Sequence, residues 1–189
     1  MSNELSILWR QAHRRLGRRA TDLRRDQSGS TAVEFAMVSF PFMALLFGII
    51  AVGLFFFTTF SLENAVEQAS RQLRTGEAQT AGMTKDQFKS NVCAPIQSYI
   101  DCAGKLRVNV QKYNLGEVIV QPSCTDGGGN LTPDADSAYL PGAANQIMLV
   151  TACLQWDLAG KIPFLTLSSM GNGAALIMAS TTFKIEPYN

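Results

Sequence analysis

The stretch "FAMVSFPFMALLFGIIAVGLFFFTTF", residues 35–60, decides the fold, because it runs for 26 residues without a charged side chain. A helix that crosses a membrane needs about 20 consecutive apolar residues, whereas the apolar region of a cleaved secretory signal has about 7–15. The sequence "SLENAVEQAS" that follows offers no cleavage site of the A-x-A kind. The sequence therefore predicts one membrane-spanning helix.

Charge is distributed unevenly about this run. Residues 1–29 carry seven arginines and three acids, a net charge of +4, and the rest of the chain carries −3. Basic flanks stay on the cytoplasmic side, which predicts a single-pass protein with its N-terminus inside and its C-terminal part across the membrane. Binding of nucleic acid is the alternative for an arginine-rich segment. Next to a membrane helix, a topology signal with affinity for the anionic lipid bilayer explains it more simply.

The helix is expected to continue beyond the apolar run. In "SLENAVEQASRQLRTGEAQ", apolar residues recur at spacings of three and four, as in an amphipathic helix: Leu62, Ala65, Val66, Ala69 and Leu73. Arg74 supplies a cation for the last turn, and Gly76 suits a helix end. We expect a continuous helix from Phe35 to Thr75, the first half in lipid and the second against a folded domain.

The remaining sequence predicts an α+β domain. "TKDQ", residues 84–87, has the form of a capping box, and Pro95 is expected to interrupt the helix that follows it. The apolar face of that helix is expected to hold Phe88, Val92, Ile96 and either Tyr99 or Ile100. Alternating or apolar runs predict strands at residues 106–111, 116–121, 146–158 and 175–185, with a long loop at 122–145.

These elements predict an α+β fold in which a small antiparallel sheet of three or four strands packs on the extended helix. Strands 106–111 and 116–121 are expected to form a hairpin through "YNLG". The expected organisation is an arginine-rich cytoplasmic leader at 1–29, a junction and membrane helix at 30–60, and an outer domain at 61–189 that includes the helix extension 61–75.

All four cysteines lie beyond the apolar run, in the part of the chain expected to face an oxidising compartment. An even count there predicts two disulfides, for which three pairings are possible. Cys93–Cys102 with Cys124–Cys153 is preferred, because it staples a helix to the adjacent turn and the long loop to a strand. A zinc site is disfavoured, since no C-x₂₋₄-C pair is present and the lone histidine, His13, precedes the membrane helix.

The same lack of histidine disfavours an enzyme. No Ser-His-Asp or Cys-His arrangement is available beyond the apolar run. Asp134 and Asp136 form a carboxylate pair, but they lie in a loop rich in proline and glycine, where acids are usually solvated turn residues. We therefore expect a non-enzymatic protein without cofactor or metal. A secreted hydrolase with a signal anchor is the weaker alternative.

The junction "GSTAVEF", residues 29–35, places one glycine, four uncharged residues and then Glu34 before the apolar run. It resembles the processing site of type IV pilin-like proteins. Over residues 24–79, with "GSTAVEFAMVSFPFMALLFGII" and "LENAVEQASRQLRTGEAQ", the chain resembles the TadE-like family of minor pseudopilins from tight-adherence (Tad/Flp) pilus systems. The resemblance continues more loosely through "FKSNVCAPIQSYIDCAGKLRVNVQ" and "STTFKIEPYN".

This resemblance implies that a prepilin peptidase cuts between Gly29 and Ser30, which leaves Glu34 as the fifth residue, next to Phe35. It also implies that Glu34 pairs with the terminal amine of a neighbouring subunit during assembly. The simpler interpretation is that Glu34 merely favours the dipole at the helix start.

The implied partners are the peptidase, other Tad pseudopilins, the major pilin and the inner-membrane assembly platform. The implied location is the inner membrane, with a periplasmic domain and with incorporation into the pilus left open. The alternative function is that of an unprocessed, membrane-anchored assembly or adhesion factor that keeps residues 1–29.

Overall fold

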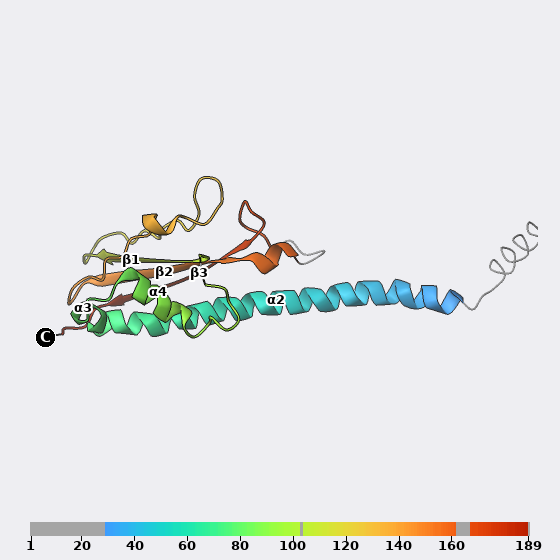
Figure 1. Ribbon diagram of the computed structural model, residues 1–189, viewed down its shortest axis with the longest axis horizontal. Coiled ribbons are helices and arrows are strands. Elements are labelled where there is room, and N and C mark those ends of the chain that lie inside the picture. The colour runs from blue at the N-terminus through green and yellow to red at the C-terminus, as the bar shows by residue number, and fades with distance from the viewer. Residues whose placement is uncertain (1–28, 103, 162–166, 189) are drawn as a thin grey trace, which may run out of the picture. The chain divides into compact units, whose positions relative to one another are not determined.

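The computed structural model describes residues 29–102, 104–161 and 167–188 (Figure 1). The chain divides into two compact units, residues 1–47 and 48–189. Helix α2 (Ser30–Arg74) begins in the first unit and ends in the second. The other elements belong to the second unit, and in chain order they are α3 (Glu77–Thr80), α4 (Lys85–Cys93), β1 (Leu106–Tyr113), η2 (Asp134–Asp136), β2 (Ile147–Trp156), η3 (Asp157–Lys161) and β3 (Ala175–Lys184).

Helix α2 confirms the expected long helix, although it begins at Ser30 rather than Phe35. Its C-terminal stripe is buried in the core of the second unit: Leu62, Ala65, Val66, Ala69 and Leu73. Arg71 and Arg74 occupy the last turn, where their charge favours the helix dipole. Gly76 follows with φ 81°, and a Cβ there would lie 2.2 Å from the Tyr188 ring, so only glycine fits this helix end.

The predicted capping box forms at the start of α4. The Thr84 side chain accepts a hydrogen bond from the backbone N–H of Gln87, and the Gln87 side chain accepts one from the backbone N–H of Thr84. The helix ends at Cys93, and residues 94–99 continue as turns around Pro95. Ile96 and Ile100 are buried, whereas Tyr99 is half-exposed, which settles the open choice in favour of Ile100.

Three antiparallel strands form the sheet in the order β1-β2-β3. Leu106 pairs with Leu154 at one end of the β1–β2 ladder, and Tyr113 pairs with Ile147 at the other. Alternate residues of the strands point into one core with the stripe of α2, among them Val108, Val150 and Ile177. Figure 1 shows the strands lying along the C-terminal part of α2. The expected α+β fold, with an antiparallel sheet on the extended helix, is confirmed.

The predicted strand at 116–121 is wrong. This segment forms no strand, and Val118 and Val120 are 82% and 66% exposed. The edge of β1 that it would have joined is occupied instead by residues 138–140. There the Val110 N–H donates to the Ala138 carbonyl and the Leu140 N–H donates to the Val110 carbonyl, at 2.8 and 2.9 Å. A distant segment therefore competes successfully for the hydrogen bonds that a local hairpin would have used.

The long loop at 122–145 is confirmed as irregular apart from η2, an isolated bridge between Thr125 and Leu131, and the bridge from Tyr139 to Val110 of β1. Asp126 organises its glycine-rich turn, since one carboxylate oxygen accepts hydrogen bonds from the backbone N–H groups of Gly128 and Asn130. This Asx-type turn gives the "GGG" sequence a local structural explanation.

Leu62→Ala tests the packing of α2 against the sheet. Leu62 is fully buried, so we expect the variant to lose about 2–5 kcal/mol of unfolding free energy. The matched control is Leu115→Ala, because Leu115 is 94% exposed and its loss should change stability by less than about 0.5 kcal/mol. Guanidinium unfolding of the full chain in detergent, followed by near-ultraviolet circular dichroism, measures both. Equal stability of the two variants would contradict the proposed core.

Candidate functional site

The junction residues singled out by the sequence lie within the first two turns of α2. Gly29 directly precedes the helix, and Ser30 is its first residue. Ser30 and Glu34 are exposed, and Phe35 is 74% exposed. A Cβ placed on Gly29 would meet no atom within 4 Å, so nothing in the described fold requires glycine at this position.

Glu34 has a single described partner. The Ser30 hydroxyl donates a hydrogen bond of 3.3 Å to its carboxylate, one helical turn away. Within residues 29–102, 104–161 and 167–188, no cation forms an ion pair with Glu34. The first turn of α2 contains no acidic residue, because Glu34 lies beyond it. Within the described residues, the Glu34 carboxylate therefore has a hydroxyl partner and lies just beyond the first turn, where the helix dipole acts most strongly.

The surface of α2 after Glu34 is apolar and exposed. In the described part of the chain, α2 is the one helix long and apolar enough to cross a membrane. Its large exposed apolar residues in the first unit are Val33, Phe35, Met37, Val38, Phe40, Phe42, Met43, Leu45, Leu46 and Phe47. A soluble monomer rarely exposes so large a contiguous apolar surface, so this unit suits lipid or neighbouring helices.

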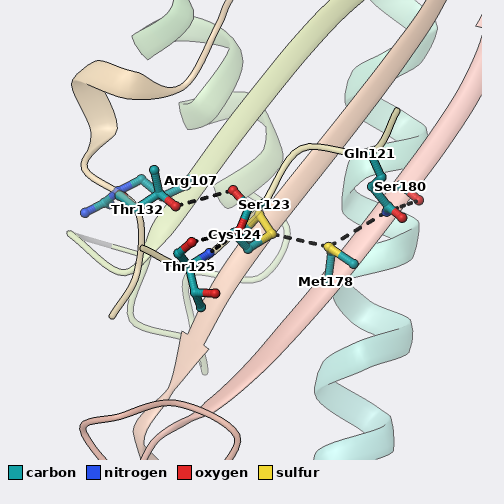
Figure 2. Close-up of a disulfide and its surroundings, with 9 residues drawn as sticks. Arg107, Gln121, Ser123, Cys124, Thr125, Thr132, Met178 and Ser180 are labelled. Atoms are coloured by element: carbon teal, nitrogen blue, oxygen red, sulfur yellow. Dashed lines mark hydrogen bonds between the residues drawn. A yellow bond between two sulfur atoms is a disulfide. The ribbon is translucent and has the colours of Figure 1, made fainter. Parts of the chain in front are cut away.

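The structure forms both disulfides of the preferred pairing, Cys93–Cys102 and Cys124–Cys153. The first joins the end of α4 to the turn before β1, over a separation of nine residues. The second joins the long loop to the central strand β2 (Figure 2). It lies on the face of the sheet opposite α2, so it fastens the loop where the helix cannot reach.

Hydrogen bonds from the outer strands hold the loop beside this disulfide (Figure 2). Arg107 of β1 donates to the Thr132 carbonyl at 2.8 Å, and Gln121 donates to the Ser180 hydroxyl of β3 at 3.3 Å. The Met178 sulfur lies 3.3 Å from the Cys124 sulfur, a contact without a donated proton because the cysteine is oxidised. All three strands thus contribute to fixing one loop over the outer face.

The expectation that Asp134 and Asp136 are both solvated turn residues is wrong for Asp134. Its carboxylate lies 3.1 Å from the Lys89 ammonium, 3.6 Å from that of Lys85 and 4.0 Å from the Arg107 guanidinium. Burial raises the pKa of Asp134, but the Lys89 hydrogen bond and the three cations outweigh burial and hold that pKa below its ordinary value of 3.8. Asp136, by contrast, is exposed as expected.

These ion pairs attach the long loop to α4. Lys85 also donates to the backbone carbonyls of Asp134 and Ser137, which ties the same two segments by main-chain contacts. Their spacing of four residues places Lys85 and Lys89 on one helical face, but local sequence does not reveal that Lys89 has a partner 45 residues away. The cluster therefore fixes the loop to α4.

The comparisons with known proteins concern the helix. Residues 29–71 match the model of the TadE-like protein family. The match begins at Gly29, includes Glu34 and the apolar run, and ends within the amphipathic extension. It covers less than a quarter of the chain and leaves the sheet outside it. Searches among curated proteins and among solved structures give no significant match.

Peptide mapping without reduction tests the disulfide arrangement in the native protein. We expect one linked peptide pair containing Cys93 and Cys102 and another containing Cys124 and Cys153. Recovery of any of these cysteines in a different pair, or as a free thiol, would contradict the arrangement.

A Cys124→Ala/Cys153→Ala variant tests the contribution of the second disulfide to stability. Its free energy of unfolding should be about 2–4 kcal/mol lower than that of the wild type, the usual effect of removing a disulfide.

Asp134→Asn tests the electrostatic attachment of the loop. Because the pKa of Asp134 is lower in the folded state, its stabilisation is present above the unfolded pKa, near 3.8, and is lost as pH falls through the folded pKa. We therefore expect the wild type to lose this increment on acidification below about pH 4, while Asp134→Asn is less stable at pH 7 and loses less on acidification.

Unfolding measured at pH 7 and pH 3 compares these proteins. Asp136→Asn is the matched control in the same turn, since Asp136 is exposed and lies outside the cluster. If Asp136→Asn reproduced the loss seen for Asp134→Asn, the specific role assigned to Asp134 would be refuted.

Proposed function

We propose, from the match of residues 29–71 to the TadE-like family, that the chain is a minor pseudopilin that takes part in assembly of a Tad-type pilus. The observation that carries the proposal is the family match starting at Gly29. Family membership implies a role in pilus biogenesis, and components of such pili generally lack enzymatic activity. The details of processing and partners below belong to the proposal.

Processing would occur between Gly29 and Ser30, where a prepilin peptidase embedded in the membrane removes residues 1–29. An exposed, uncrowded glycine at the start of the helix supports this assignment, because a backbone without a side chain can enter a membrane-embedded protease. Cleavage frees the α-amine of Ser30, which is mostly protonated at neutral pH. It also turns Glu34 into the fifth residue of the shortened chain.

Assembly would use the carboxylate of Glu34. A charged group near the lipid boundary is costly unless it has a partner, so pairing with the terminal amine of a neighbouring subunit would favour one register between subunits. The exposure of Glu34 and its lack of a described cationic partner support such an external pairing. The partners would be other Tad pseudopilins, the major pilin and the inner-membrane assembly platform.

The location follows from the same chemistry. An apolar helix near the N-terminus and two disulfides after it suit a membrane-anchored domain on the extracytoplasmic side. We propose the inner membrane, with the arginine-rich segment in the cytoplasm and the sheet in the periplasm. A fixed anchor that keeps residues 1–29, acting as an assembly or adhesion factor, is the competing function.

Two substitutions separate processing from assembly in cells that contain the prepilin peptidase. Gly29→Val should leave the full-length chain in the membrane, because the bulkier residue blocks the cut. Glu34→Gln should permit cleavage but reduce recovery of the subunit with other pilus components, since the neutral amide cannot pair with an amine. Gel mobility reports cleavage, and cross-linking followed by affinity purification reports assembly.

Glu63→Gln is the matched control, because Glu63 is an exposed acid of the same helix beyond the apolar run. It should behave as the wild type in both measurements. The proposal fails if wild-type protein is never cleaved, and the assembly role of Glu34 fails if Glu34→Gln and Glu63→Gln assemble equally well.

A further inference from the structure

Aromatic side chains from three separate segments gather where the sheet domain meets the apolar part of α2. We call this group the aromatic collar and include with it Leu158, an exposed apolar residue two positions after Trp156: Phe55 and Phe57 of α2, Tyr99, Trp156 and Leu158. The Phe55 and Trp156 rings meet edge to face with centroids 5.7 Å apart, and those of Phe57 and Tyr99 lie 5.3 Å apart. All five residues belong to the second unit, so the collar is part of the folded domain.

The collar is packed on one side and open on the other. Phe55 and Trp156 pack against the core, whereas Phe57, Tyr99 and Leu158 are 53%, 50% and 40% exposed. Among the described residues, neither the Tyr99 hydroxyl nor the Trp156 indole N–H donates to a protein acceptor. An apolar ring with a free polar tip is the kind of side chain that concentrates at the boundary between lipid and water.

Polar groups close to the collar residues in sequence have partners within the described fold. The Thr58 and Thr59 hydroxyls donate hydrogen bonds to the carbonyls of Leu54 and Phe55 in the preceding turn. Both hydroxyl donors are therefore satisfied within the helix. Lys105 bridges Asp101 and Asp157 at 2.7 and 2.9 Å, and these pairs raise the pKa of Lys105, so its ammonium stays charged.

The collar is also continuous along α2 with the candidate membrane helix, since no charged residue separates Phe57 from Phe35. We propose that the aromatic collar seats the folded domain directly on the lipid surface, with Tyr99, Trp156 and Leu158 at headgroup level. The boundary of the bilayer then falls near residues 55–60, and no stalk separates domain from membrane. This inference rests on the proposed insertion of α2.

Fluorescence quenching by brominated lipids tests the seating, because the sequence contains two tryptophans, Trp9 and Trp156. In the full-length Trp9→Phe variant, Trp156 is the sole reporter. The protein is reconstituted into phosphatidylethanolamine and phosphatidylglycerol vesicles, with bromine placed either near the headgroup or deep in the acyl chain. We expect shallow bromine to reduce Trp156 emission roughly twofold and deep bromine to reduce it much less, as interfacial burial predicts.

Two relocated reporters serve as controls, each in a Trp9→Phe/Trp156→Phe background. Tyr113→Trp places the reporter at the opposite end of the sheet, because Tyr113 pairs with Ile147 at the start of β2. At about 3.3 Å per residue that end lies about 30 Å from residue 156, and its emission should be unaffected by either lipid. Phe42→Trp places the reporter inside the apolar run, and deep bromine should quench it.

The outcomes distinguish the two proposals. Quenching of Phe42→Trp by deep bromine without quenching of Trp156 overturns the seating and leaves the membrane anchor intact. Failure of deep bromine to quench Phe42→Trp overturns insertion and, with it, this inference. If Trp156 resists both brominated lipid and aqueous acrylamide, another protein surface covers the collar, and seating on lipid is again overturned. Equal quenching of Trp156 and Tyr113→Trp would also overturn it, because the contact would not be specific to the collar.

Discussion

The structure depends on the burial of one stripe of α2 beneath the sheet. Leu62, Val66 and Leu73 are fully or almost fully buried there, and each such side chain contributes about 1.5–3 kcal/mol when removed from water. The same helix exposes an uncharged surface earlier in its sequence. The two halves of this continuous helix therefore have different environments. The surface of the N-terminal half suits lipid, and the C-terminal half is covered by the protein core. The C-terminal half of α2 therefore belongs to the core of the second unit.

A three-stranded sheet on one helix leaves its outer face without a second layer, and the long loop compensates for this. The Cys124–Cys153 bridge fastens the loop to the central strand, and Asp134 attaches it to Lys85 and Lys89 of α4. The disulfide and the ion pairs thus hold the loop on the outer face of the sheet, where a second layer of helices or strands would otherwise pack. Such stapling suits a domain expected to work in an oxidising compartment.

The features that depend on local periodicity and composition could be predicted from the sequence. The span and stripe of α2, the capping box at Thr84 and the apolar strands β2 and β3 all followed from spacing and composition. The segment 116–121 failed because residues 138–140 occupy the edge of β1, a competition that local sequence does not reveal. Asp134 and the aromatic collar were missed for the same reason, since their partners come from distant segments. At the junction, the sequence singled out Gly29 and Glu34, and the roles proposed for them depend on molecules outside the chain.

The central claim is that the junction at Gly29 is a cleavage site and that α2 is the assembly helix of a pseudopilin. Intact mass and N-terminal sequencing of the protein purified from its native membranes address this most directly. The account predicts a chain that begins at Ser30 and carries two disulfides. A chain that still begins at Met1, in cells with an active prepilin peptidase, would contradict it and leave a permanent membrane anchor bearing a stapled outer domain.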